Sequence, residues 1–277
     1  MHVVVVVGKD RYGRWAGFAD ALQAAGHRVE FMRLEASFEN GQFLTPEEVF
    51  ARRCDVLFCV SEVAARTTPS ATNALTVFWV ERSGGFGSVP LGDIVVVSPF
   101  WDVVDAAGGA RRAFLWLTPP CRGIAPPSQA GGGVVVVGVW HPVREQVVRA
   151  LAEKGIGVRG VGAGWSRARL KRSLYRATRR YEDMLAEIAK ADVVVYLLCR
   201  GLNGLLSDCL HMGKCVVVEP FEGVDLLGEG VCVAGDVVTE AGRLAVFDLG
   251  RRRYESAAGE VVGRFAPQRL IQALLDA

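Results

Sequence analysis

Residues 134–158 read VVVVGVWHPVREQVVRALAEKGIGV, and residues 3–29, VVVVVGKDRYGRWAGFADALQAAGHRV, have the same design. Each stretch begins with a run of valines, turns at a glycine, continues as an amphipathic helical pattern and ends at another glycine before a new strand. A β-branched run without polar alternation is typical of a parallel strand covered on both faces. Gly26 and Gly155 stand where a helix end favours a left-handed residue. We therefore predict a β–α–β unit in each half of the chain.

Further apolar runs follow in both halves. They cover residues 54–61, 75–80 and 93–98 in the first half, and 157–162, 191–199, 215–219 and 230–235 in the second. Strands that alternate with helices favour parallel sheets with right-handed crossovers. The predicted fold class is therefore α/β, with two tandem Rossmann-like domains. We expect a ligand cleft between them, because such folds bind ligands at the carboxyl ends of their strands.

The stretch TPPCRGIAPPSQAGGG at residues 118–133 separates the two halves. It holds four prolines and four glycines and has no periodic pattern, so it is interpreted as a linker. We predict an N-terminal domain at residues 1–122, a linker at 123–132 and a C-terminal domain at 133–262. A closing helix at 263–277 is expected to pack back toward the first domain.

The composition narrows the class of protein. The net charge of +2 gives no global sign of a nucleic-acid partner. Seven cysteines without a CxxC pair, most of them in apolar runs, predict buried free thiols in a reducing cytosol. The four histidines lack ligand spacing, so no metal is predicted. The first apolar run has no basic leader and is too short to span a bilayer, which favours a cytoplasmic protein. The excess of arginine over lysine fits either a thermophile or a GC-rich genome.

The most specific motif is RGLNGLLSDCLHMGKCVVVE at residues 200–219. Asn203 and Gly204 are expected to turn the chain off a strand into a helix that ends at Gly213. The free amides of residues 203–206, including that of Leu205, would then suit a pyrophosphate. Asp208 in the second turn is able to accept both hydroxyls of a ribose, or to pair with a neighbouring arginine.

A second candidate anion site follows the strand at 134–137. Gly138 gives the chain room to turn, Pro142 suits the first helical turn, and Arg144 follows in that turn. A guanidinium at a helix N-terminus can add a two-pronged phosphate contact, while a solvated surface arginine is the alternative. GVGAGW at 160–165 has the look of a dinucleotide fingerprint, but no clear helix follows it. We predict a simple strand-end turn there.

These motifs resemble the group 1 retaining glycosyltransferases of the GT-B fold. Their signature EGFGLPVLEAMACGKPVV aligns without gaps on residues 200–217, with Arg200 and Asp208 on its two glutamates. Their FVGRLVPEKG corresponds to VVGVWHPVRE, which puts Arg144 on the phosphate-binding lysine. DIVVVSPFWDVVDAAGG at 93–109 resembles the end of the family's acceptor domain, and RFAPQRLIQALL at 264–275 resembles its closing helix.

The resemblance implies transfer of a sugar from a UDP- or GDP-linked donor to an acceptor hydroxyl, without a metal or other cofactor. Arg144 and Arg200 would stabilise charge on the departing diphosphate. The donor site would comprise Gly138, Asn203, Gly204, Leu205 and Asp208. The chain departs from the family where Arg200 replaces a glutamate, Val139 replaces the phosphate-binding arginine and Asp208 shortens the second glutamate. Two alternatives stay open: a non-catalytic binding protein of the same fold, and a sugar-nucleotide epimerase.

A run of basic residues without an acid precedes the helix expected at 181–190. It comprises Arg167, Arg169, Lys171, Arg172, Arg176, Arg179 and Arg180. The run fits a solvated face, or a surface for anionic lipid or a phosphorylated acceptor, and it has few aromatic residues for nucleic acid. On the acceptor side we place Gly8, Arg11 and Gly13, with Arg169, Lys171, Arg172 and Arg176 there or at an anionic surface. The acceptor, lipid-linked or a glycan, is left open, and peripheral contact with the inner membrane surface is an expectation.

Overall fold

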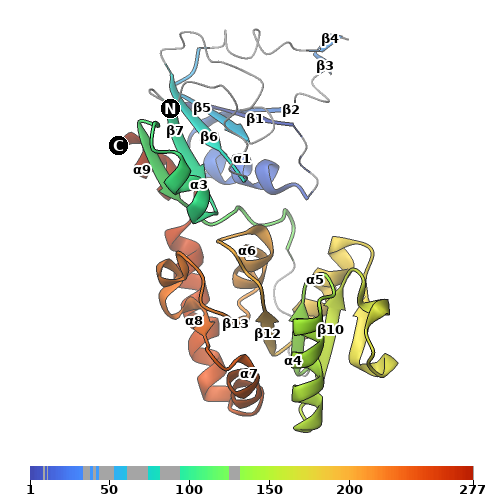
Figure 1. Ribbon diagram of the computed structural model, residues 1–277. Coiled ribbons are helices and arrows are strands. Elements are labelled where there is room, and N and C mark those ends of the chain that lie inside the picture. Colours follow the sequence, from blue (N-terminus) through green and yellow to red (C-terminus); the bar gives the residue numbers. More distant parts are fainter. Residues whose placement is uncertain are drawn as a thin grey trace. The chain divides into compact units, whose positions relative to one another are not determined.

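The computed structural model describes residues 1–8, 10, 12–33, 38–39, 42–43, 53–60, 74–81, 94–124 and 132–276. The chain divides into two units, each with its own parallel six-stranded sheet (Figure 1). Unit 1 comprises Met1–Arg122, Leu202–Gly204 and Phe265–Ala277, and unit 2 comprises Gly123–Gly201 and Leu205–Arg264. The prediction of an α/β fold with two Rossmann-like domains is confirmed.

The sheet of unit 1 has the order β2-β1-β5-β6-β7-β8. Its strands are β1 (His2–Val7), β2 (Arg28–Arg33), β5 (Val56–Val60), β6 (Leu75–Trp79), β7 (Ile94–Ser98) and β8 (Arg112–Leu115), and a short hairpin pairs β3 (Phe38–Glu39) with β4 (Gln42–Phe43). The helices in the described part of this unit are α1 (Arg14–Ala24), α3 (Trp101–Ala106) and α9 (Pro267–Leu275). The order reverses between β1 and β5, so the carboxyl ends of these two strands meet at that point.

The valines of β1 are buried on both faces of this sheet, as predicted. Val3, Val5 and Val7 belong to the core that includes residues of α1 and α9, and Val4 and Val6 belong to the core that includes Val103 of α3. Alternate residues of a strand point to opposite faces, so a strand covered by helices on both sides needs apolar residues throughout. This accounts for the run of valines without polar alternation.

Two returning segments complete unit 1. Phe265, just before α9, accepts a hydrogen bond on its main-chain oxygen from Nε1 of Trp116 at 3.1 Å, and the two rings meet edge to face. The main chain of Leu202 donates to the oxygen of Pro99 at 2.7 Å and accepts from the amide of Thr118 at 2.8 Å. Residues 202–204 are therefore held by unit 1, although both neighbouring stretches belong to unit 2.

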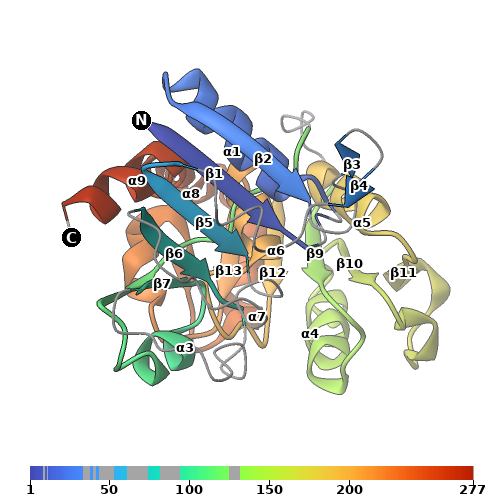
Figure 2. The ribbon, with the colours of Figure 1, turned by 90° about the horizontal axis from the view of Figure 1, so that it is seen from above.

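The sheet of unit 2 has the order β11-β10-β9-β12-β13-β14. Figure 2 labels its strands from β11 to β13. Its strands are β9 (Val134–Val137), β10 (Val158–Gly162), β11 (Tyr175–Ala177), β12 (Val193–Tyr196), β13 (Cys215–Val218) and β14 (Cys232–Val233). Its helices are α4 (Pro142–Glu153), α5 (Tyr181–Lys190), α6 (Gly204–His211, of which Gly204 belongs to unit 1), α7 (Val237–Val246) and α8 (Asp248–Arg264), with short 3-10 turns η2 (Trp165–Arg167), η3 (Arg172–Leu174) and η4 (Val224–Gly230). Numbered in chain order the strands run 3-2-1-4-5-6, the dinucleotide-binding arrangement, which reverses between β9 and β12.

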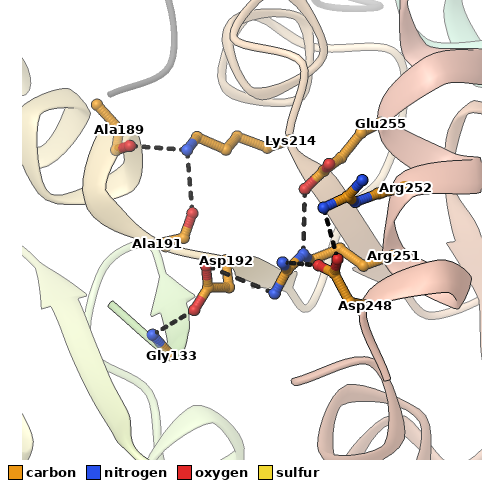
Figure 3. Close-up of polar contacts among 9 residues, drawn as sticks. All are labelled: Gly133, Ala189, Ala191, Asp192, Lys214, Asp248, Arg251, Arg252 and Glu255. Atoms are coloured by element: carbon orange, nitrogen blue, oxygen red, sulfur yellow. Dashed lines mark hydrogen bonds and ion pairs between the residues drawn. The ribbon is translucent and has the colours of Figure 1, made fainter. Parts of the chain in front are cut away.

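A buried lysine ties β13 to the end of α5. Lys214 is 3% exposed, and its Nζ donates to the main-chain oxygens of Ala189 at 2.7 Å and Ala191 at 3.0 Å (Figure 3). Burial lowers the pKa of Lys214, while the charges of Glu255 and Asp192 oppose this shift. Both carbonyl acceptors lie at the amino edge of the sheet, so Lys214 has a structural position.

An ion-pair network attaches α8 to the same amino edge. Arg251 lies 3.5 Å from Asp192 and 3.3 Å from Glu255, and it also bonds Asp248 (Figure 3). Asp192 accepts a hydrogen bond from the amide of Gly133 at 2.9 Å, immediately before β9. The polar network thus occupies the edge opposite the carboxyl ends of the strands, and leaves the carboxyl ends to other residues.

All seven cysteines are free, and all except Cys54 are buried, as the apolar runs predict. Burial raises the pKa of Cys59 and of Cys215 to about 12. Within the described ranges, no helix is long and apolar enough to cross a membrane.

Candidate functional site at the carboxyl edge of unit 2

Gly138 ends β9 at the point where the strand order of unit 2 reverses. Its φ of +117° is a conformation that favours glycine. Its amide donates to the oxygen of Val161 at 3.0 Å, and its own oxygen accepts from Nε1 of Trp165 at 2.9 Å. A Cβ on Gly138 would lie 3.0 Å from Cζ of Arg144. The glycine therefore leaves room for a guanidinium against the end of β9.

Arg144 fills that room and braces two strand ends. Its side chain is buried, Nη1 donates to the main-chain oxygen of Val139 at 2.6 Å, and Nη2 donates to that of Leu197 at 2.7 Å. Burial lowers the pKa of Arg144, although the charges of Tyr196 and Glu219 oppose this shift. Both terminal nitrogens are thus engaged by backbone. The expected alternatives were a phosphate contact or a solvated arginine, and the structure places Arg144 as an internal brace between the loops after β9 and β12.

Two consecutive residues of the loop after β12, Leu198 and Cys199, make contacts that hold the loop in place. Leu198 has a φ of +57°, which is uncommon for a residue with a side chain, and it is 42% exposed. Its amide donates to Oε2 of Glu219, directly after β13, at 3.0 Å. Sγ of Cys199 contacts the oxygen of Gly201 at 3.1 Å. Sequence reasoning missed Glu219, although a glutamate directly after the valine run CVVVE was a signal for a strand-end residue.

The start of α6 brings together the predicted residues Asn203, Gly204 and Leu205, all half-buried, and Arg200 is exposed shortly before them. In unit 1, Gly204 lies beside Arg14: a Cβ on this glycine would be 2.6 Å from Cζ of Arg14. Nη1 of Arg14 donates to the oxygen of Pro119 at 2.6 Å. A guanidinium therefore lies against the first residue of α6.

Sequence reasoning missed Arg14, although the internal repeat of the chain indicates this residue. Gly8 ends the first strand of unit 1 as Gly138 ends the first strand of unit 2. Arg14 and Arg144 follow these glycines at the same spacing. Aligning the two halves would have pointed to Arg14 once Arg144 was chosen.

Asp208 lies inside unit 2. It has no exposed surface, and its Oδ2 accepts a hydrogen bond of 2.6 Å from the hydroxyl of Tyr181, the first residue of α5. The expected positions were a surface open to a ribose or a pair with an arginine. The hydrogen bond from Tyr181 shows that the carboxylate joins α6 to α5.

The predicted acceptor-side residues of unit 1 lie around the start of α1. Gly8 follows β1, near the point where the strand order reverses. Gly13 has a φ of +63°, and a Cβ there would be 2.9 Å from Cβ of Arg122, whose amide donates to the oxygen of Tyr12. Because Gly13 has no side chain, it leaves room for Arg122, the last residue of the segment Met1–Arg122 of unit 1. Arg11 lies outside the described residues.

The basic run surrounds the edge strand β11, and all seven of its basic side chains are exposed. Nη1 of Arg176 pairs with Glu187 at 2.6 Å, and the guanidinium of Arg172 lies 5.4 Å from the centre of the Tyr175 ring.

The stretch GVGAGW contains the end of β10 and the start of η2, so it is a strand-end turn, as predicted. Its first glycine serves packing, because a Cβ on Gly160 would lie 2.2 Å from the ring of Trp165.

No cluster of three His, Cys, Asp or Glu side chains suited to a metal ion occurs among the residues that the structure describes. The structure brings Gly138 and Arg144 together, and it gathers Asn203, Gly204 and Leu205 at one helix start. The structure does not group Asp208 or the basic run with these residues. Asp208 lies in the interior of unit 2, and the basic run surrounds β11.

No protein-family model and no curated protein matches the sequence. Solved structures match nearly the whole chain. AviGT4, a glycosyltransferase involved in avilamycin A biosynthesis, is 14% identical with a TM-score of 0.65, over 99% of this chain and 96% of that chain. Anabaena HepE in complex with UDP-glucose is 13% identical with a TM-score of 0.59, over 100% and 98%. Sucrose-phosphate synthase from Thermosynechococcus elongatus is 11% identical with a TM-score of 0.58, over 100% and 99%. These matches show that the chain has the GT-B glycosyltransferase fold.

Proposed function

We propose that this chain is a glycosyltransferase that moves a sugar from a nucleoside-diphosphate sugar to an acceptor hydroxyl. The observation that carries the proposal is that side-chain contacts hold the carboxyl ends of β9 and β12, where the strand order of unit 2 reverses. Open parallel sheets bind ligands outside the carboxyl ends of their strands at such a point. Here Gly138, Arg144 and the strained Leu198 fix the main chain on both sides of it. The GT-B fold, and the UDP-glucose complex of a structure with this fold, favour a sugar nucleotide as the ligand.

The diphosphate has a natural partner in the start of α6. The first amides of a helix lack partners within the helix, and the helix dipole places partial positive charge there. Gly204 and Leu205 begin α6, and exposed Arg200 precedes them. We assign the direct phosphate contact to Arg200 and these amides, and the support of their loop to Arg144.

In the reaction the bond between the anomeric carbon and the β-phosphate oxygen breaks, and the acceptor oxygen loses its proton and bonds to that carbon. The nucleoside diphosphate and the proton are the other products. Negative charge grows on the departing diphosphate, and preorganised donors aimed at that charge are the largest common source of rate enhancement. The guanidinium of Arg200 carries out that role without a metal or other cofactor. The donor is proposed to be UDP- or GDP-linked, and the acceptor to be lipid-linked or a glycan.

Thermal denaturation with UDP, GDP, ADP and their sugars tests the binding step. A nucleotide at 100 times its dissociation constant stabilises a protein by about 2.7 kcal/mol, so the correct base should raise Tm by several degrees. Arg200→Gln should reduce this shift, and Arg53→Gln, at an exposed position of unit 1, should not. Equal shifts for parent and Arg200→Gln would remove Arg200 from the site.

A further inference from the structure

The residues around β11 contain the longest run of charges of one sign in the sequence. The basic surface is defined as Arg167, Arg169, Lys171, Arg172, Arg176, Arg179 and Arg180. These residues come from η2, η3 and β11, from the loops between them, and from the segment between β11 and α5. Figure 2 shows β11 at the outer edge of its sheet, and no further described strand pairs with it. All seven cationic side chains are exposed, whereas the chain as a whole carries a net charge of only +2.

Among the residues that the structure describes, Arg176 and Arg180 of the basic surface have carboxylate partners. Arg176 pairs with Glu187 at 2.6 Å, and Arg180 lies 3.7 Å from Glu182. Glu187 is buried and also pairs with Arg159 at 3.0 Å and Lys190 at 2.9 Å. One internal carboxylate thus fixes the base of the surface without neutralising it. Within the described ranges, Arg167, Arg169, Lys171 and Arg179 form no ion pair.

We propose that the basic surface binds the face of a bilayer that contains anionic lipids. Its cations are distributed over an edge strand, two short turns and the adjoining loops, and this spread argues against a single small phosphate. An extended array of cations matches an extended array of phosphates, and arginine binds phosphate with two donors at once. The half-buried Leu170, Leu174 and Tyr175 add a shallow apolar component between the charges.

The same surface is poorly equipped for nucleic acid. Binding of single strands uses exposed aromatic rings on which bases stack. Trp165 is fully buried, and Tyr175 is half-buried with Arg172 over its ring. A membrane contact needs no such platform. It is independent of the proposed transfer reaction, although it would bring a lipid-linked acceptor to the protein.

Co-sedimentation with vesicles of phosphatidylcholine, with or without phosphatidylglycerol, tests the proposal. The parent should sediment with the anionic vesicles at low salt and be released at high salt, because exposed charges are screened beyond about 8 Å at physiological ionic strength. The test variant combines Arg167→Ser, Arg169→Ser, Lys171→Ser and Arg179→Ser, which leaves the Glu187 pairs intact. Each basic residue near an anionic surface contributes about fivefold to partitioning, so this variant should bind at least tenfold more weakly.

A matched control combines Arg53→Ser, Arg111→Ser, Arg112→Ser and Arg269→Ser, four exposed positions of unit 1. It loses the same charge and should bind like the parent, and unchanged Tm values will show that both variants fold. The proposal is overturned if the parent does not bind anionic vesicles at low salt, or if both variants lose binding equally. Tighter binding to single-stranded RNA than to the vesicles, measured under the same conditions, would assign the surface to nucleic acid instead.

Discussion

Arg144 and Leu197 are joined by a hydrogen bond of 2.7 Å from Nη2 to the main-chain oxygen, across 53 residues of sequence. The same guanidinium donates to Val139, so one buried cation holds both strand ends where the sheet order of unit 2 reverses. The family that the sequence resembles has a phosphate-binding lysine at this place. In this chain the longer, forked side chain holds the protein's own carbonyls.

Arg144→Lys should therefore destabilise the protein. An ammonium cannot reproduce the two-pronged contact, and leaving buried carbonyl groups without donors costs about 2–4 kcal/mol. Denaturant unfolding measures the loss, with Arg149→Lys on the exposed face of the same helix as the control. Unchanged stability with lost nucleotide affinity would show that Arg144 contacts phosphate directly.

The pair of Tyr181 and Asp208 predicts a second stability effect. Tyr181→Phe and Asp208→Asn should each lower the free energy of unfolding by about 1–2 kcal/mol, because both weaken a partly buried hydrogen bond of 2.6 Å. The double variant should lose less than the sum, since both changes remove the same contact. A variant Asp208→Asn that keeps full stability but binds nucleotide more weakly would restore the ribose role implied by the resemblance.

Glu187 makes stability depend on acid pH. Burial favours the neutral carboxyl, but hydrogen bonds from Lys190 and Arg159 and the charge of Arg176 outweigh it, so the pKa of Glu187 lies below its usual value of 4.5. A group whose pKa is lowered in the folded state contributes stability that is present above about pH 4.5 and is lost as the pH falls through the folded-state pKa.

Tm measured between pH 7 and pH 3 should therefore fall more steeply for the parent than for Glu187→Gln, and the two curves should converge at the acid end. Glu182→Gln, on the solvent-exposed start of α5, should follow the parent. Parallel curves for parent and Glu187→Gln would mean that the cations around this carboxylate contribute nothing to folding.

Glu219 is predicted to position the loop after β12. Glu219→Ala removes the acceptor for the amide of Leu198, while Glu219→Gln keeps an oxygen at the same distance from the main chain. Because Leu198 depends on this support to keep its positive φ, the alanine variant should raise KM for the donor severalfold, and glutamine should restore most of the affinity. Equal KM values for all three proteins would make Glu219 a surface residue without influence on the site.

The strands with valine runs were predictable because burial on both faces leaves no alternative to apolar residues, as in β1, β9, β12 and β13. The edge strands β8 and β11 were not predicted. Their sequences, RAFL and YRA, contain arginines, because an edge strand has a partner on one side only and tolerates polar residues. At β8 and β11, pairing with the neighbouring strand, and not the local amino-acid composition, determines that the segment is a strand.

The candidate site was predictable in its location but not in its contacts. Gly138, Gly204 and the start of α6 follow from glycines at strand and helix ends. The acceptors of Arg144, the burial of Asp208 and the return of Leu202 to unit 1 depend on residues far apart in sequence. A hydrogen-bond partner of that kind is set by the packing of whole elements, which motif spacing does not encode.

The most direct measurement of the central claim is the initial rate of nucleoside-diphosphate release from a panel of UDP- and GDP-linked sugars, with and without a mixture of hydroxyl acceptors. We expect one donor to be turned over, release to be faster with acceptor, and Arg200→Gln to lose about two orders of magnitude in rate, as is common when one charge-stabilising donor is removed. Saturable binding of a sugar nucleotide without any release would contradict the transferase and identify a binding protein of the same fold.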